Sequence, residues 1–516
     1  MGRTGQRARR RARLCLAVVV GGVGLVGCEP KATTLECTSD GVVVHGVDGQ
    51  PAAPGATPAA TELCVVGPGA NVTELSLAVD DDGDVYTGIT RNGSMESAVM
   101  VSADDGATWK RRVPRLDGQP ALSPIMGWLV RDPDTGRLFG SSLGDPGCSE
   151  PLGDQFAWSD DDGASWKIRP DQLCNGGDWG KTFVGPAATD AGRARLAESG
   201  YPNVVYHCSG ATGDLTRYCW RSYDGGDTFE RTETNAISGG GPLADKGALR
   251  GPDPCYGETD FHQIAGQGVV AADGTIYMPV NACSYVSITK STDEGATWSL
   301  LRVPVARGRG WYTHGGVPGF FDPFNAGEPT TPKQTFMGLY GPIAMANVFS
   351  QQLVVDEEGT LYLAWVNAPD QQLHLSVSSD GGTTWTSSPI VSPPGVQRST
   401  IASIDVAEPG HIALAYYGST DKQAYDGYVA ESTDALAAQP TFTTAVVSPG
   451  APLMPHRVGE PIESAGIDIA PDGSVWASFA RDRCIVWYPD DLTKVECDAS
   501  LDYNESRYSL VVAHLR

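Results

Sequence analysis

The residues best suited to chemistry gather in one short stretch of this sequence, residues 257–262, which read GETDFH. If this stretch is a β-strand, Glu258, Asp260 and His262 share one face, because successive side chains of a strand point to opposite faces. Two carboxyl groups and an imidazole on one face can perform the acid–base steps that cleave a glycosidic bond. We take these three as candidate catalytic residues. The alternative is a hydrogen-bonded polar network that lines a water-filled channel.

A repeated pattern of eight residues, S-x-D-x-G-x-[T/S]-[W/F], indicates the scaffold that would position this stretch. It occurs five times, starting at Ser102, Ser159, Ser222, Ser291 and Ser378. The Asp side chain can accept hydrogen bonds from backbone N–H groups further along, and Gly permits positive φ, so each copy predicts a tight turn. The residues expected to build these turns and to fill the space between strands are Asp104, Trp109, Asp161, Trp166, Asp224, Phe229, Asp293, Trp298, Asp380 and Trp385.

A second repeat runs in phase with the first. Short apolar stretches flank a turn glycine, clearly at Gly83, Gly274, Gly359 and Gly473, and more weakly at positions 136, 200 and 410. These are hairpin patterns, and each of the five eight-residue copies follows its glycine by 17 to 23 residues. Degraded copies at 432–434 and 489–491 follow the last two hairpins. The chain is therefore predicted to be all-β, a seven-bladed β-propeller of four-stranded antiparallel blades over residues 62–516, with a six-bladed ring as the alternative.

The eight-residue pattern resembles the Asp box, or BNR repeat, of sialidase-like β-propellers. In that family the box is a structural turn and lies outside the active site. Sialidases also carry an arginine in an F/Y-R-I-P motif before the first box. Arg91, in the sequence TRN, does not match that motif. The resemblance therefore implies a sialidase-like fold without true sialidase activity.

Hairpin turns and Asp-box turns should lie on one face of a propeller, which leaves the other connections to form a loop-rich face. Residues that precede the inner strands should reach the channel mouth on that face. The candidate ligand-binding residues there are Lys181, Asn347, Arg398, Arg457, Glu460 and Glu463. Trp311 and Tyr312 join them from the long aromatic-rich insertion 300–346, where exposed rings could stack on sugars and buried rings would instead form a small core.

The first 27 residues have the features of a signal peptide. Six arginines precede a short apolar run, 14–26, and Cys28 follows the sequence LVG. The four residues LVGC at 25–28 resemble a bacterial lipobox, which implies cleavage before Cys28 and lipidation of its thiol; an ordinary secretory signal is the alternative. We expect an exported lipoprotein of the cell envelope, at the outer membrane or cell surface. Residues 28–61, rich in Pro, Ala and Gly, are interpreted as a tether to the propeller at 62–516.

The charge balance limits the possible partners. The formal net charge is −25, and it becomes more negative when the arginine-rich leader is removed. Nucleic acid is therefore not expected as a partner, and the membrane is expected only through the lipid anchor. We expect a monomer without cofactor or metal. The acidic turn 80–84 lacks the closing glutamate of an EF-hand loop, because Arg91 occupies that position.

Ten cysteines remain after Cys15 and Cys28 are set aside, and an even number in an exported chain favours disulfides. Proximity in the sequence suggests the pairs Cys37–Cys64, Cys148–Cys174, Cys208–Cys219, Cys255–Cys283 and Cys484–Cys497. All but the first would fall on the loop-rich face, where cross-links would hold a binding surface in place.

These observations predict a lipoprotein whose propeller binds a glycan or protein ligand on its loop-rich face. The first alternative is an exo-acting glycoside hydrolase that uses carboxylates at the channel mouth. The second is a scaffold that assists the assembly of other proteins.

Overall fold

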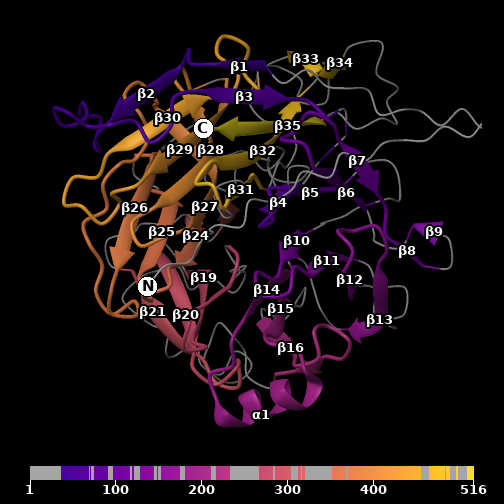
Figure 1. Ribbon diagram of the computed structural model, residues 1–516. Helices are drawn as coiled ribbons and strands as arrows, with labels where there is room; N and C mark the ends of the chain where they lie inside the picture. The colour runs from indigo at the N-terminus through magenta and orange to yellow at the C-terminus, as the bar shows by residue number, and fades with distance from the viewer. Residues whose placement is uncertain are drawn as a thin grey trace, which may run out of the picture. The chain divides into compact units, whose positions relative to one another are not determined.

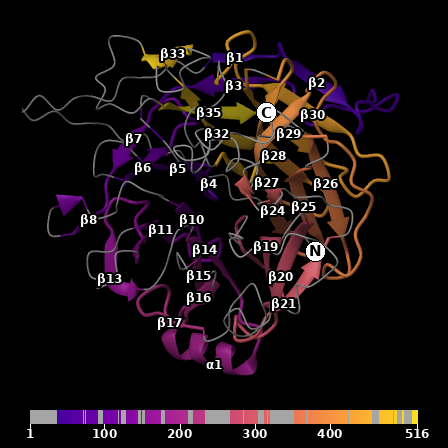
Figure 2. The ribbon, with the colours of Figure 1, turned by 180° about the vertical axis from the view of Figure 1, so that it is seen from behind.

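The computed structural model describes residues 36–68, 70, 72, 75–90, 97–116, 119–120, 128–143, 148, 153–174, 180–210, 217–232, 266–282, 285–303, 312–314, 317–319, 351–367, 370–422, 424–454, 464–482, 484–487, 495–497 and 508–516. The chain divides into two compact units, Met1–Lys31 and Ala32–Arg516, and all described residues belong to the second. This unit is a seven-bladed β-propeller of mainly four-stranded antiparallel blades, as predicted (Figures 1 and 2).

The first four blades each consist of four consecutive strands, which run in order from the channel outward. Blade 1 is β4 (Leu75–Val79), β5 (Val85–Thr90), β6 (Ser97–Ser102) and β7 (Lys110–Arg112). Blade 2 is β10 (Trp128–Arg131), β11 (Leu138–Leu143), β12 (Asp154–Ser159) and β13 (Lys167–Leu173). Blade 3 is β14 (Lys181–Gly185), β15 (Val204–Gly210), β16 (Arg217–Ser222) and β17 (Glu230–Arg231). Blade 4 is β18 (Val269–Val270), β19 (Ile276–Ala282), β20 (Tyr285–Ser291) and β21 (Ser299–Arg302).

The last three blades depart from this regular order. Blade 5 has three strands, β24 (Gln351–Val355), β25 (Leu361–Val366) and β26 (Leu373–Ser378). Blade 6 is β27 (Arg398–Val406), β28 (Ile412–Ser419), β29 (Asp426–Ser432) and β30 (Phe442–Val446), with β2 (Val42–His45) added at its outer edge. Blade 7 is β31 (Gly466–Ile469), β32 (Val475–Asp482), β35 (Tyr508–Leu515), β3 (Leu63–Val66) and β1 (Glu36–Thr38).

A few elements lie outside the blades. Three two-stranded hairpins pair β8 (Arg115–Leu116) with β9 (Gln119–Pro120), β22 (Tyr312–His314) with β23 (Val317–Gly319), and β33 (Cys484–Trp487) with β34 (Val495–Cys497). Helix α1 (Asp190–Ser199) lies between the first two strands of blade 3, and Thr189 caps its N-terminus. No helix among the described residues is long and apolar enough to span a bilayer.

Both ends of the chain contribute to blade 7. Figure 1 shows β35, near the C-terminus, beside β3, near the N-terminus, and Val65 pairs with Ala513 in their antiparallel ladder. The C-terminal strand is therefore the third strand of its blade, and the fourth comes from the other end of the chain. Joining the two ends in one sheet converts the row of blades into a closed ring, because otherwise the first and last blades would have no covalent or ladder connection.

This closure corrects two expectations. The segment interpreted as a tether supplies β1 and β2, which pair with β3 and β30, so the folded body begins by Glu36 and not at residue 62. The hairpin β33–β34 lies between the second and third strands of blade 7, so the degraded box at 489–491 does not join its third and fourth strands. That connection does not exist in blade 7, since the fourth strand comes from the N-terminal part of the chain.

The five eight-residue turns share one set of hydrogen bonds. In the first copy, Ser102 Oγ accepts from the Gly106 N–H at 2.9 Å, and Asp104 accepts from both the backbone and the hydroxyl of Thr108. In the four copies that end in Trp, the ring N–H also donates to the glycine carbonyl, as Trp109 does to Gly106; Phe229 of the third copy has no ring N–H. Residues 105 and 106 both have positive φ, which explains the glycine. In blade 5, the bonds from Thr384 lower the pKa of Asp380 to about 2.

The degraded copy in blade 6 keeps part of this arrangement. Ser432 Oγ still donates to Asp434, but the backbone N–H that Asp434 accepts now belongs to Thr441, seven residues on. Phe442 follows and is fully buried, as expected for a displaced aromatic plug. The aspartate therefore closes a longer turn by the same chemistry.

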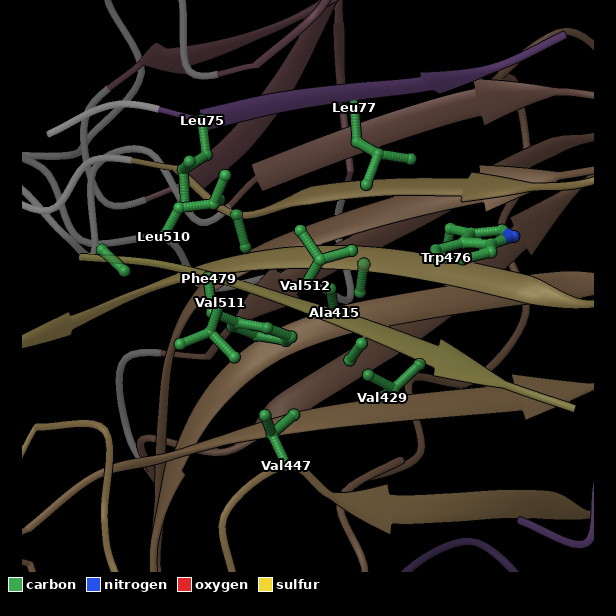
Figure 3. Close-up of a cluster of buried hydrophobic side chains, with 14 of the residues drawn as sticks. Leu75, Leu77, Ala415, Val429, Val447, Trp476, Phe479, Leu510, Val511 and Val512 are labelled. Carbon is green, nitrogen blue, oxygen red and sulfur yellow. The ribbon is translucent and has the colours of Figure 1, made fainter. Parts of the chain in front are cut away.

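The largest hydrophobic core lies where blades 6, 7 and 1 meet. Figure 3 shows Leu75 and Leu77 of blade 1 together with Phe479 and Val512 of blade 7 and Val429 of blade 6. All are buried, so closure of the ring also buries apolar surface contributed by both ends of the chain.

Three disulfides are present among the described residues: Cys37–Cys64, Cys148–Cys174 and Cys208–Cys219. The first joins β1 to β3, and the third joins opposite positions of β15 and β16, inside the strands and not in their connection. The backbone register also places Cys484 opposite Cys497. Cys255, Cys283 and Cys28 lie outside the described residues.

We predict that Tyr417→Phe destabilises the propeller. The Tyr417 hydroxyl donates to the Ala480 carbonyl at 3.1 Å and accepts from the Ala480 N–H at 2.8 Å. It thus forms the two backbone hydrogen bonds that a neighbouring β-strand would otherwise form with this residue of blade 7. Removing it leaves two buried backbone groups unpaired, at a cost of roughly 2–4 kcal/mol in the free energy of unfolding measured with denaturant. The control is Tyr206→Phe, because the buried Tyr206 hydroxyl has no partner among the described residues; its change should be near zero.

Candidate functional site

A cavity of about 540 Å³ occupies the channel between the seven inner strands. These strands are β4, β10, β14, β18, β24, β27 and β31, and each contributes lining residues. Neighbouring inner strands contact one another around the full ring. Most of the lining side chains are aliphatic, and the charged ones are Arg131, Asp405 and Asp468. The channel is therefore large enough for a small ligand, but its described lining offers few charged groups.

Side-chain-to-backbone hydrogen bonds connect several neighbouring inner strands. Ser76 accepts from the Leu129 N–H at 2.9 Å, between blades 1 and 2. Ser464, two residues before the inner strand of blade 7, accepts from the Leu75 N–H at 2.7 Å. Gln352 accepts from the Gln267 N–H at 3.1 Å, between blades 5 and 4. Polar residues of the inner strands are thus already engaged in connecting blades.

Close approach between blades also constrains residue size. A Cβ on Gly466 would lie 2.4 Å from Ser478 Oγ and 2.7 Å from the Leu77 side chain. Glycine at the start of β31 therefore lets β4 of blade 1 approach blade 7.

Asp405 and Asp468 form a carboxyl pair in this channel. Asp405 accepts from the Ile469 N–H at 2.9 Å, and Asp468 accepts from the Val79 N–H at 2.6 Å. The two carboxyl groups are also hydrogen-bonded to each other. Burial raises the pKa of Asp405, and burial together with the charge of Asp405 raises the pKa of Asp468 well above its usual value.

The spacing of this pair does not suit glycoside hydrolysis. Carboxyl groups that act on the two sides of a glycosidic bond stand about 5 Å apart or more, to leave room for the sugar. Asp405 and Asp468 are in hydrogen-bond contact, and each already holds a backbone N–H. Their arrangement connects strands and does not flank a substrate bond.

A second polar network lies buried between blades 2 and 3. His207 Nε2 is 2.8 Å from Asp154 Oδ2, and His207 Nδ1 is 3.0 Å from Thr182 Oγ1. The Thr182 hydroxyl donates in turn to Ser141 at 3.4 Å. This order of groups resembles a nucleophile relay, but the His207 and Thr182 side chains are fully buried. The network therefore stabilises the contact between the two blades.

Another titratable residue is Asp426, the first residue of β29 in blade 6, at the loop-rich face. It accepts from the Gly427 N–H, and burial raises its pKa to about 7. The charge of Arg481 in blade 7 acts in the opposite direction, and Arg481 donates to Ser448 at 2.8 Å. A carboxyl group with this pKa can exchange protons near neutral pH.

The structure describes only part of the predicted site. Lys181 and Arg398 are the first residues of β14 and β27, so both begin inner strands at the loop-rich end, and both are buried with interactions of their own. The backbone of Tyr312 lies in the hairpin β22–β23. The remaining predicted residues lie outside the described part of the chain: Glu258, Asp260, His262, Asn347, Arg457, Glu460, Glu463 and Trp311.

Sequence reasoning did not find the pair Asp405–Asp468, the pair Asp154–His207 or Asp426. The one available signal was a lone aspartate within an otherwise apolar inner-strand pattern, as in the GIDI of β31. A buried carboxyl group is costly without a partner, so such a residue indicates a specific contact. The sequence does not say which residue makes that contact.

One group of potential metal ligands occurs among the described side chains, namely Cys37, Glu62 and Cys64. The two cysteines are joined in a disulfide, and Glu62 pairs with Arg516 at 2.9 Å. Thiolates are the form of cysteine that binds metal, so this group does not constitute a metal site in the oxidised protein.

We predict that Asp154→Ala destabilises the protein much more than Asp160→Ala. Asp154 is buried, and its loss leaves a ring nitrogen of His207 without its partner, at a cost of roughly 2–4 kcal/mol. Asp160 pairs with Arg137 at 2.7 Å, but its side chain is half exposed, so its loss should cost about 1 kcal/mol or less. Denaturant unfolding of both variants measures the difference, and equal values would contradict the assignment of the buried network.

Comparison with known proteins adds a likeness in fold at low identity. No protein-family model and no curated protein sequence matches this chain. Among solved structures, it is similar to a protein of unknown function from Dyadobacter fermentans DSM 18053, at 12% identity and a TM-score of 0.39, with 93% of this chain and 99% of that chain covered.

Two further similarities are to glycosidase propellers. The Hadza microbial sialidase Hz136 is 14% identical at a TM-score of 0.39, over 87% of this chain and 92% of that one. The α-L-arabinanase of Penicillium chrysogenum is 12% identical at a TM-score of 0.37, over 79% and 98%. Because these values are low, we infer function from the chain's own residues.

Proposed function

We propose that this chain is a cell-envelope lipoprotein whose propeller binds a glycan on its loop-rich face. The observation that carries the proposal is the uneven distribution of connections between the two faces. Five residues, 80–84, separate β4 from β5 on the hairpin face, whereas residues 232–268 and 303–350 join successive blades on the opposite face. Binding residues concentrate on long loops that a rigid scaffold supports.

The disulfides support the same face. Cys148 lies between the second and third strands of blade 2, and Cys174 directly follows its fourth strand, so this bond fastens two connections on the loop-rich side. A cross-linked loop loses less conformational entropy when it binds a ligand.

A glycan suits the composition of the longest connection. Trp311 and Tyr312 belong to an insertion rich in aromatic residues, whose rings can stack on the apolar faces of sugars while their polar atoms form hydrogen bonds. The acidic composition does not favour polyanionic ligands, so a neutral or amino-bearing glycan fits best.

We predict that Trp311→Ala and Tyr312→Ala each weaken glycan binding by roughly 5- to 30-fold without changing the melting temperature, because a lost aromatic stacking contact costs about 1–2 kcal/mol. A glycan array would identify the ligand, and isothermal titration would measure the affinity. The matched control is Leu436→Ala, an exposed apolar side chain beside the hairpin glycine Gly410, which should bind as the wild type does.

Other outcomes would redirect the assignment. Hydrolysis of the bound glycan, lost in Glu258→Gln and Asp260→Asn, would establish the glycoside hydrolase alternative with His262 as a third candidate. A stable protein partner in mild-detergent purification, together with no glycan binding, would favour the assembly scaffold. Unchanged binding in both aromatic variants would place the ligand elsewhere on the propeller.

We further predict that Cys28→Ser prevents attachment to the membrane. The proposal makes the Cys28 thiol the site of lipidation, and the apolar run before it is too short for an ordinary spanning helix. Expressed in a bacterium with labelled fatty acid, the wild type should carry label and sediment with membranes, whereas the variant should do neither. Cys15→Ser is the control and should remain labelled. Label that persists in the Cys28 variant would contradict this site.

A further inference from the structure

The point at which the ring closes depends on a short inner strand. β31 of blade 7 has four residues and contacts both β27 of blade 6 and β4 of blade 1. Its own blade is assembled from both ends of the chain. The three inner strands β27, β31 and β4 therefore form the closure seam of the propeller.

Two backbone N–H groups cross this seam to carboxyl groups. The Ile469 N–H of β31 donates to Asp405 of β27 at 2.9 Å, and the Val79 N–H of β4 donates to Asp468 of β31 at 2.6 Å. The hydrogen bond between Asp405 and Asp468 joins these two contacts into one chain. Each carboxyl group thus accepts a hydrogen bond from the backbone of a neighbouring inner strand and is also hydrogen-bonded to the other carboxyl group.

Two ionised carboxylates have no hydrogen to share, so the bond between them requires one proton. We propose that a single proton shared by Asp405 and Asp468 holds the closure seam, and that its removal loosens the contact between blades 6, 7 and 1. The cavity gives water access to both groups, so the proton can exchange with solvent. This device does not depend on the proposed ligand or on its binding face.

Among the described residues, few other charges face the pair. Arg131 of β10 is the remaining charged residue among the described cavity-lining side chains, and it lies 3.7 Å from Asp81. His411, the residue before β28, acts on Asp405 electrostatically but is hydrogen-bonded to Glu431 at 2.7 Å. The described surroundings thus provide no cation in direct ion-pair contact with either carboxyl group.

The direction of the pH dependence follows from the raised pKa values of the pair. Both groups hold their protons more tightly in the folded chain than an unfolded aspartate does, whose pKa is about 3.9. The stabilisation is complete below that value and is lost as the pH rises through the folded pKa of the pair. A rise in pH should therefore weaken the seam, whereas a fall in pH should preserve it.

The test compares Asp468→Asn with Asp468→Leu in the full folded chain. Asparagine keeps an oxygen for the Val79 N–H and an N–H for Asp405, and it does not titrate. From pH 6 to pH 9, the melting temperature of the wild type should fall by several degrees more than that of Asp468→Asn. Asp468→Leu removes the acceptor and should melt lower at every pH. The control Asp472→Asn, on the exposed hairpin of blade 7, should retain the wild-type dependence.

Hydrogen exchange localises the effect. After correction for intrinsic exchange rates, peptides that cover 75–79 and 466–469 should lose protection at pH 9 in the wild type and keep it in Asp468→Asn. Equal pH dependence in these two proteins would overturn the proposal. So would restoration of the wild-type melting temperature at pH 9 by millimolar calcium but not in Asp468→Asn, because a cation would then hold the pair.

Discussion

The free inner edges of the blades are the constraint on which this propeller depends. Each inner strand pairs with its own blade on one side only, so its other row of N–H and C=O groups faces the channel or the next blade. Serine, glutamine and aspartate side chains satisfy several of these groups, as Ser76 does for the Leu129 N–H. Polar side chains therefore bind one blade to the next where no β-ladder can form.

Closure of the ring adds a second requirement, because the C-terminal strands of blade 7 must be joined to blade 1, which comes from the other end of the chain. β3 and β35 meet this requirement by pairing in blade 7, and the core shown in Figure 3 surrounds the junction. Asp405 and Asp468 lie at the inner margin of the same junction. The ladder and the core hold its outer part, and the carboxyl pair holds its inner part.

The contacts that hold the fold together and the proposed ligand-binding surface lie in different parts of the propeller. The eight-residue turns engage their own Ser, Asp and Trp groups internally, so they have little capacity left to bind a ligand. The described channel groups are similarly occupied between blades. In the proposed function, the ligand is bound by the long connections on the opposite face, which can vary without disturbing either set of contacts.

The sequence by itself determined the local units: the hairpin glycines at positive φ, and turns whose hydrogen bonds join residues two to four positions apart. Such contacts join residues that are close in the sequence, so the sequence alone reveals their pattern. The number of these repeated units predicted seven blades. Only the tertiary structure decided which distant groups meet. Asp405 and Asp468 lie 63 positions apart, and β3 reaches β35 across nearly the whole chain. A buried polar residue requires a hydrogen-bond partner, but the amino-acid sequence does not show which residue that is. Ring closure and the packing of the blades determine the partner.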